Sequence, residues 1–107
     1  MPFFKLDEMP APPVAPKYST AYGPTITGKQ LEIGYYTEPK GTGAAPHAHA
    51  TEQIVLVLAG RLRMRVDQEV REMGPGEVAL ILSNQDHEQE ALEDGTRFVS
   101  FKTTNTE

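Results

Sequence analysis

The chain has 107 residues and carries 10 Lys and Arg against 15 Asp and Glu, a formal charge of −5 at pH 7. This length fits one domain, and the acidic balance argues against nucleic acid or an anionic membrane as a partner. The sequence has no cysteine, which excludes disulfides, thiolate nucleophiles and sulfur-bound metals. It has neither a transmembrane-length apolar run nor a signal-like start, so we expect a cytoplasmic protein.

Residues 1–24 are predicted to form an extended N-terminal arm, separate from a barrel domain over residues 25–107. The arm is punctuated by Pro10, Pro12, Pro13, Pro16 and Pro24. Proline fixes φ and removes a backbone donor, so we expect no helix and few ladder hydrogen bonds here. Two readings stay open: a disordered tail, or an arm that lies on the barrel or is exchanged with a partner subunit.

The rest of the chain reads as short strands separated by turns. Strands are predicted at residues 30–37, 52–58, 61–66, 69–73, 78–82, 87–92 and 96–103, and residues 39–46 are predicted to form a loop. Asp94–Gly95 predicts a hairpin between the last two strands. No segment has a helical period. The pattern therefore favours an all-β sandwich or barrel.

The three histidines of the chain provide the clearest chemical signal. His47 and His49 are two residues apart, so on an extended backbone their imidazoles point to the same face. Gln53 is an even number of residues from both histidines, so its side chain is expected on the same face of the strand. Glu52 is an odd number of residues away and is expected on the opposite face. His87 begins a later strand. Three imidazoles and one oxygen donor suit a divalent metal such as Fe, Mn, Ni, Zn or Co.

The order of residues around these histidines resembles the two motifs of the cupin superfamily. Gly41, His47, His49 and Gly60 fall at the places of the first motif, and Gly76 and His87 at those of the second. Asn84 stands where the second motif usually has glycine, and it can adopt the same left-handed turn. The resemblance implies a double-stranded β-helix, a jelly-roll barrel, with one metal bound inside its mouth.

The same resemblance implies His47, His49, Gln53 and His87 as the metal ligands. Cupins usually have Glu at the fourth position, and here the register places Gln53 there. Glu52 is the alternative, but choosing it would flip the side chain to the other face of the strand. A neutral amide leaves the charge of a divalent ion uncompensated, which favours an anionic ligand and strong Lewis-acid behaviour.

Within the superfamily, the first motif looks like that of the small uronate ring-opening cupins of pectin and alginate breakdown. Those enzymes also use an acid on the last barrel strand. Here that strand, residues 97–102, has no Asp or Glu. No catalytic residue is therefore assigned.

Three functional hypotheses follow from this resemblance. The leading one is a metal-dependent enzyme that acts on a small oxygenated metabolite, sugar-like or keto-acid-like, by Lewis-acid catalysis of the isomerase, lyase or ring-opening type. The second is an Fe(II) three-histidine dioxygenase. The third is a non-catalytic cupin that binds a small molecule. Fold alone does not choose among them.

Other residues carry secondary expectations. Arg61, Arg63 and Arg65 form a basic stripe, interpreted as a solvated strand face or else an anion-binding wall. One of Tyr35 and Tyr36 should be buried. Gln89 and Ser100 are expected to line the cavity. Three aliphatic residues share the face of their strand opposite Gln53 and need cover, which suggests a homodimer: Ile54, Leu56 and Leu58.

Overall fold

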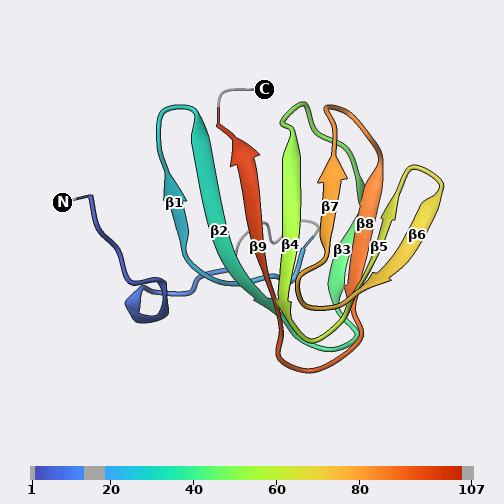
Figure 1. Cartoon of the computed structure of the whole chain (residues 1–107), viewed down its shortest axis with the longest axis horizontal. Helices are drawn as coiled ribbons and strands as arrows, with labels where there is room; N and C mark the ends of the chain where they lie inside the picture. Colours follow the sequence, from blue (N-terminus) through green and yellow to red (C-terminus); the bar gives the residue numbers. More distant parts are fainter. Residues whose placement is uncertain (1, 14–18, 105–107) are drawn as a thin grey trace.

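The computed structural model describes residues 2–13 and 19–104, so Pro16 and residues 105–107 of the predicted barrel domain lie outside the described residues. Nine strands dominate this part of the chain (Figure 1). They are β1 (Thr25–Thr27), β2 (Leu31–Glu38), β3 (Gly43–His47), β4 (Gln53–Ala59), β5 (Leu62–Val66), β6 (Glu69–Met73), β7 (Val78–Ile81), β8 (His87–Ala91) and β9 (Thr96–Thr103).

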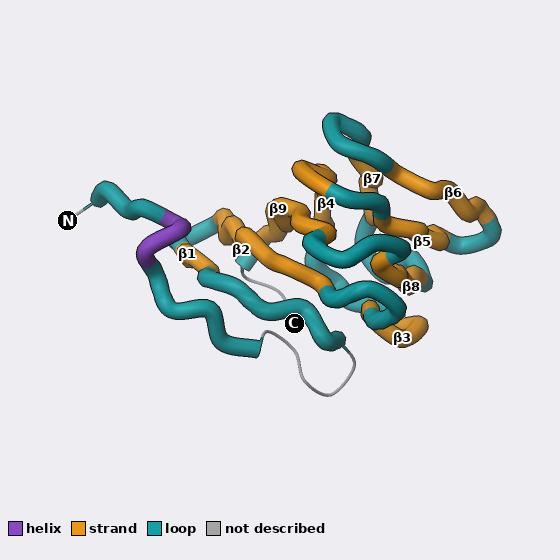
Figure 2. Tube along the Cα trace, turned by 90° about the horizontal axis from the view of Figure 1, so that it is seen from below, coloured by secondary structure: helices purple, strands orange, loops and turns teal. Residues whose placement is uncertain are grey.

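The strands form two antiparallel sheets that face each other. The first has the order β1-β2-β9-β4-β7 and the second the order β3-β8-β5-β6. Between β2 and β9 the chain crosses from one sheet to the other at every connection except the β5–β6 turn. Figure 2, seen from below, shows the two rows of strands. This is the all-β cupin-type barrel that the sequence predicts.

The core lies between the two sheets and is built from every second side chain along each strand, the ones that point inward. Val55 and Val57 of β4 are fully buried, and they face Leu62 and Met64 of β5 within one cluster that includes Phe98 of β9. Burying each such side chain contributes about 1.5–3 kcal/mol. The alternation in β4 and β5 therefore fixes which face of each strand turns inward, and Gln53 turns inward with Val55.

All seven predicted strands are present to within one residue at each end, but two local predictions were wrong. Residues 43–46, expected to belong to a loop, form β3 together with His47, and this strand pairs with β8. Asp94–Gly95 does not close a hairpin, because β8 and β9 lie in different sheets. Gly95 has a φ of +73°, the left-handed conformation that favours glycine in a tight turn. The two strands that this turn connects are nevertheless not paired with each other.

The described part of the N-terminal arm lies on the barrel of its own chain. Isolated bridges join Ser19 to Ala44 and Tyr22 to Thr37. The expectation of no helix was wrong at one place, since Leu6–Glu8 forms a single 3-10 turn between Pro2 and Pro10. Asp7 of this turn accepts a hydrogen bond from the Tyr35 hydroxyl at 3.1 Å. No helix within the described residues is long and apolar enough to cross a membrane.

Candidate metal centre

Two of the three histidines are brought together by the pairing of β3 with β8. His47 ends β3 and His87 begins β8, and the two are direct partners in the register. His49 follows in the next loop, where its carbonyl accepts a hydrogen bond from the backbone N–H of Asn84 at 2.7 Å. Asn84 has the left-handed φ, +64°, that the sequence analysis expected of it. The β3–β8 ladder and this loop contact thus place all three imidazoles in one group.

The three rings lie close enough to share one ion. Their centroids are 4.3 Å apart for His47 and His87, 4.8 Å for His49 and His87, and 5.6 Å for His47 and His49. One ring nitrogen of each lies within 4.8 Å of the others. Such a group has the donor set and spacing of a metal site.

Backbone carbonyls determine which ring nitrogen carries the proton in His47 and in His87. Nδ1 of His47 lies 2.7 Å from the Ala45 oxygen, and Nδ1 of His87 lies 2.9 Å from the Gln85 oxygen. Nδ1 of His49 lies 2.9 Å from the carbonyl oxygen of Thr51. A carbonyl only accepts, so Nδ1–H of His47 and of His87 donates and their Nε2 atoms hold lone pairs, the tautomer that metal-bound histidines use. Nδ1 of His49 also lies 2.8 Å from the Thr51 hydroxyl, which can donate or accept, so this contact is compatible with either tautomer of His49.

Gln53 completes the group from β4, in the opposite sheet. Its Oε1 lies 3.1 Å from Nε2 of His49, and its Nε2 donates to Ser100 Oγ at 2.8 Å. The contact between His49 and Gln53 is a hydrogen bond when His49 carries its proton on Nε2, and it brings two lone pairs together, as metal ligation requires, when the proton is on Nδ1. Glu52 is exposed on the outside of the barrel, as its parity predicts.

Burial keeps one of the imidazoles neutral. His87 is only 3% exposed, and this burial lowers the pKa of its imidazole. The neighbouring His47 and His49 rings lower the pKa further, because their positive forms would repel a charged His87. A neutral ring at neutral pH retains the lone pair that ligation requires.

The histidines open onto a cavity of about 100 Å³ inside the barrel. Tyr36 and Phe98 form its apolar floor, and their rings meet edge to face at 5.9 Å. Ser19 and Ala21 of the N-terminal arm form part of its wall. Gln53, Gln89, Ser100 and Lys102 add polar groups near the histidines. The arm is therefore a part of this cavity and not a detached tail.

The comparison with protein families agrees with this architecture. The Cupin domain family model matches residues 34–99, more than half of the chain. The chain belongs to the cupin family. No curated protein matches it.

Solved structures resemble this cupin in fold at low sequence identity. KdgF from Halomonas sp. is 20% identical with a TM-score of 0.86, over 98% of this chain and 94% of that one. An RmlC-like cupin from Shewanella frigidimarina is 17% identical with a TM-score of 0.81, over 100% and 94%. Bacillus subtilis oxalate decarboxylase, a protein with Mn(II) centres, is 16% identical with a TM-score of 0.78, over 97% of this chain and 29% of that one.

Sequence reasoning missed one polar residue beside the cavity of this cupin. Glu38, at the end of β2, is completely buried. One carboxylate oxygen accepts a hydrogen bond from Gln89 Nε2 at 3.0 Å, and the other accepts from the Thr20 hydroxyl of the arm. Glu38 thus orients the Gln89 amide and holds the arm. The alternation of side chains along β2 predicts that Glu38 faces inward, but Glu38 belongs to neither of the two sequence motifs.

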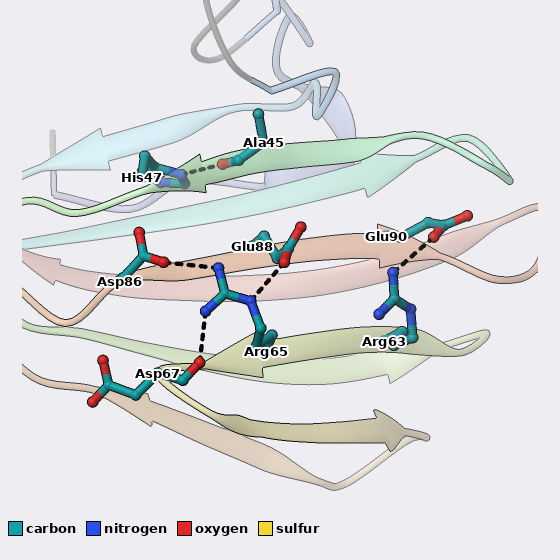
Figure 3. A network of polar contacts seen from close by, with 8 residues as sticks. All are labelled: Ala45, His47, Arg63, Arg65, Asp67, Asp86, Glu88 and Glu90. Atoms are coloured by element: carbon teal, nitrogen blue, oxygen red, sulfur yellow. Dashed lines mark hydrogen bonds and ion pairs between the residues drawn. The ribbon is translucent and has the colours of Figure 1, made fainter.

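The basic stripe lies on the outer face of the second sheet and is neutralised there. Arg65 donates to Glu88 at 2.6 Å and to Asp86 at 2.8 Å, while Arg63 pairs with Glu90 at 3.1 Å (Figure 3). These ion pairs lie at the surface, where solvent screens them, so they contribute little to stability. The interpretation as a solvated strand face fits, and the stripe is not a wall of the histidine cavity.

A larger groove of about 520 Å³ lies between β6 and β7, away from the histidines. Met64, Met73 and Leu80 contribute apolar walls, and Glu69 and Arg71 contribute opposite charges at its rim. It exists because β6 and β7 are unpaired edges of different sheets. Among the described residues, the three histidines form the group of side chains that could hold a metal ion, and they lie outside this groove.

Proposed function

We propose that this cupin is a metal-dependent enzyme that acts on a small oxygenated metabolite, sugar-like or keto-acid-like, by isomerase, lyase or ring-opening chemistry. His47, His49, Gln53 and His87 would hold one divalent transition metal, Fe, Mn, Ni, Zn or Co. The observation that carries the proposal is the convergence of the three imidazoles: one ring nitrogen of each lies within 4.8 Å of the others, Nδ1 of His47 and of His87 faces a backbone carbonyl, and Nε2 of His49 faces Gln53.

The chain's own residues would prepare this site in two ways. The Ala45, Thr51 and Gln85 carbonyls fix the rings before a metal arrives, so that little ordering entropy is lost on binding. Ser100 orients the Gln53 amide so that Oε1 faces His49. A metal bound there supplies Lewis-acid polarisation of a carbonyl or enol oxygen.

The neutral donor set favours an anionic substrate. Three neutral imidazoles and one amide would leave the full charge of a divalent ion uncompensated, whereas a glutamate at position 53 would remove one unit of it. An enolate or carboxylate oxygen would therefore be stabilised strongly beside the ion.

The remaining partners and the location are proposals of the same kind. We infer a small-molecule ligand, no nucleic-acid or membrane partner, and a homodimer in the cytoplasm. The acidic composition and the absence of cysteine support the partners and the location. The homodimer is supported by an uncovered apolar face on the first sheet, where Ile54 is 37% exposed and Leu58 41% exposed. The prediction of an arm at residues 1–24 and a barrel at 25–107 is retained as a proposal.

Metal content tests the function directly. We expect protein purified without chelator or affinity tag to contain close to one equivalent of a transition metal, measured by elemental mass spectrometry. His87→Ala should lose nearly all of it. Ser100→Ala, which removes only the partner of the Gln53 amide, should weaken metal binding about tenfold. Gln68→Ala, in the exposed β5–β6 turn, is the matched control and should retain the metal.

The outcome also separates the three hypotheses. Zinc, nickel, cobalt or manganese directs assays to isomerase and lyase substrates. Bound iron with substrate-dependent oxygen uptake would establish the dioxygenase instead. A folded wild-type protein that takes up none of Fe, Mn, Ni, Zn and Co would contradict the metalloenzyme, and ligand binding without metal would then support the non-catalytic cupin.

A further inference from the structure

One cationic side chain of the histidine cavity has no role in the site described above. Lys102 lies on the inward face of β9, directly across from Gln53 in the register, and lines the cavity while only partly exposed. Inward positions of a small barrel are usually filled by apolar side chains, as Phe98 fills the same face of β9 four residues earlier. An ammonium group here needs a compensating partner.

The described residues do not supply that partner. Over residues 2–13 and 19–104 the Lys102 side chain makes no ion pair or hydrogen bond. Glu32 lies across from it on β2 and brings a carboxylate to the same face of the sheet, but no ion pair joins the two side chains, and Glu32 accepts a hydrogen bond from the Thr27 hydroxyl at 3.5 Å. The buried carboxylate of Glu38 bonds Gln89 and Thr20. Lys102 thus presents a positive charge to the cavity.

The charge of the cavity lining indicates the chemical class of its ligand. Among the described residues that line the cavity there is one Lys, no Arg, and no Asp or Glu. The lining therefore carries about one positive charge within a chain whose net charge is −5, and a divalent metal would raise the local charge further. An anionic ligand compensates this arrangement.

The size of the cavity and the form of the cation favour a carboxylate. A volume of about 100 Å³ corresponds to roughly three water molecules, enough to enclose a carboxylate group and the carbon beside it. Bound phosphate is commonly met by the N–H groups of a helix N-terminus or by an arginine fork. The described chain has no α-helix, and no arginine lines this cavity.

We propose that Lys102 binds the carboxylate of the substrate, so that the carbon next to it is held beside His49 and Gln53. This inference rests on the proposed function, because it concerns the same cavity. Lys102 is then the specificity-determining residue: it selects small carboxylic acids over their neutral analogues and sets the orientation in which the acid meets the metal site. Ser100 and Gln53 are its nearest inward neighbours on β9 and β4.

The test uses pyruvate and its neutral amide, pyruvamide, as probes of full-length protein loaded with Mn²⁺, with binding followed by isothermal titration calorimetry. Lys102→Met should weaken pyruvate binding about 10- to 100-fold, the usual cost of losing a charge-assisted hydrogen bond. Pyruvamide binding and manganese content should not change. Lys102→Arg should keep the preference for pyruvate. Lys40→Met, at an exposed loop position, is the control and should behave as wild type.

Each result tests the role of Lys102 independently of whether the protein binds a metal. Pyruvate binding that is unaffected by Lys102→Met, or an equal loss for pyruvate and pyruvamide, overturns the role of Lys102 while manganese content still supports the proposed function. Tighter binding of inorganic phosphate than of pyruvate overturns the carboxylate assignment. If no metal binds, the proposed function fails, and the titration of metal-free protein decides: preference for pyruvate that depends on Lys102 supports the inference, and no such preference overturns it.

Discussion

Tyr36 is a buried phenol on the cavity floor whose ionisation is coupled to folding. Burial raises its pKa above the usual 10.0, and the nearby charge of Glu32 raises it further, although the hydrogen bond with Thr25 acts in the opposite direction. The folded chain therefore keeps this proton where the unfolded chain has released it. The stability that this provides is complete below pH 10 and is lost as the pH rises from 10 through the raised pKa.

We therefore expect the urea midpoint of the wild-type protein to fall more steeply above about pH 10 than that of Tyr36→Phe, as measured by circular dichroism. Comparing the two proteins removes the contribution of lysines, which titrate in the same range. Tyr22→Phe, at a tyrosine that is 39% exposed, controls for the loss of one phenol. Identical pH slopes for wild type and Tyr36→Phe would contradict this coupling.

At the scale of single residues, side-chain parity predicted most of the cavity. It placed Gln53 inward and Glu52 outward, and it placed Gln89 and Ser100 on the cavity wall. Parity gives the direction of a side chain but not its partner. The bond from Gln89 to Glu38 joins strands of different sheets, and such a contact depends on how the sheets pack.

At the scale of the element, β3 depends on a close approach to β8 at Gly43. A Cβ added to Gly43 would lie 1.9 Å from the Gln89 carbonyl oxygen, a backbone atom that cannot turn aside. We expect Gly43→Ala to lower the free energy of unfolding by about 1–3 kcal/mol in urea denaturation, the usual cost of overpacking. Because β3 carries His47, metal affinity should fall as well.

The matched control is Gly28→Ala, in the β1–β2 turn. An added Cβ there would have its nearest contact at 3.3 Å, from the Leu31 carbonyl oxygen, and the glycine does not need a positive φ. We expect this variant to stay within about 0.5 kcal/mol of wild type. If Gly43→Ala were as stable as the wild-type protein, β3 and β8 would not approach each other as closely as described.

The strand β3 also shows where prediction from local pattern stops. Residues 39–46 contain Gly and Pro and lack alternation, so they read as a loop. Residues 43–47 form a strand because β8 offers an unpaired edge, and that edge comes from residues forty or more positions later in the chain. The Asp94–Gly95 turn failed as a hairpin signal for the same reason, since a turn dipeptide specifies the bend and not the sheet to which the next strand belongs.

At the scale of the whole molecule, the outer face of the first sheet carries an apolar row across four strands. Ile33, Phe101, Ile54 and Leu80 are successive partners in the registers of β2, β9, β4 and β7. Phe101 is 40% exposed and Leu80 52% exposed. Monomeric proteins rarely leave a contiguous surface of this kind uncovered. We expect a second copy of the chain to cover it.

Sedimentation velocity tests this expectation. The wild-type protein should sediment as a dimer at micromolar concentration, and Phe101→Glu should sediment as a folded monomer, because a charge buried at the centre of the interface is strongly unfavourable. Val70→Glu, at a position 50% exposed on β6 of the other sheet, should remain a dimer. A wild-type protein that stays monomeric would show that this face has another role.

The alternation of the chain between the two sheets has a consequence for how the molecule folds. Apart from the β1–β2 and β5–β6 hairpins, every pairing joins strands far apart in the sequence. High contact order of this kind makes folding slow, because long loops must close before their contacts form. Residues 47–53 meet residue 87 only after β8 has been synthesised and has joined β3. A ribosome-bound chain that ends before β8 therefore carries two of the three histidines but not the centre that they form.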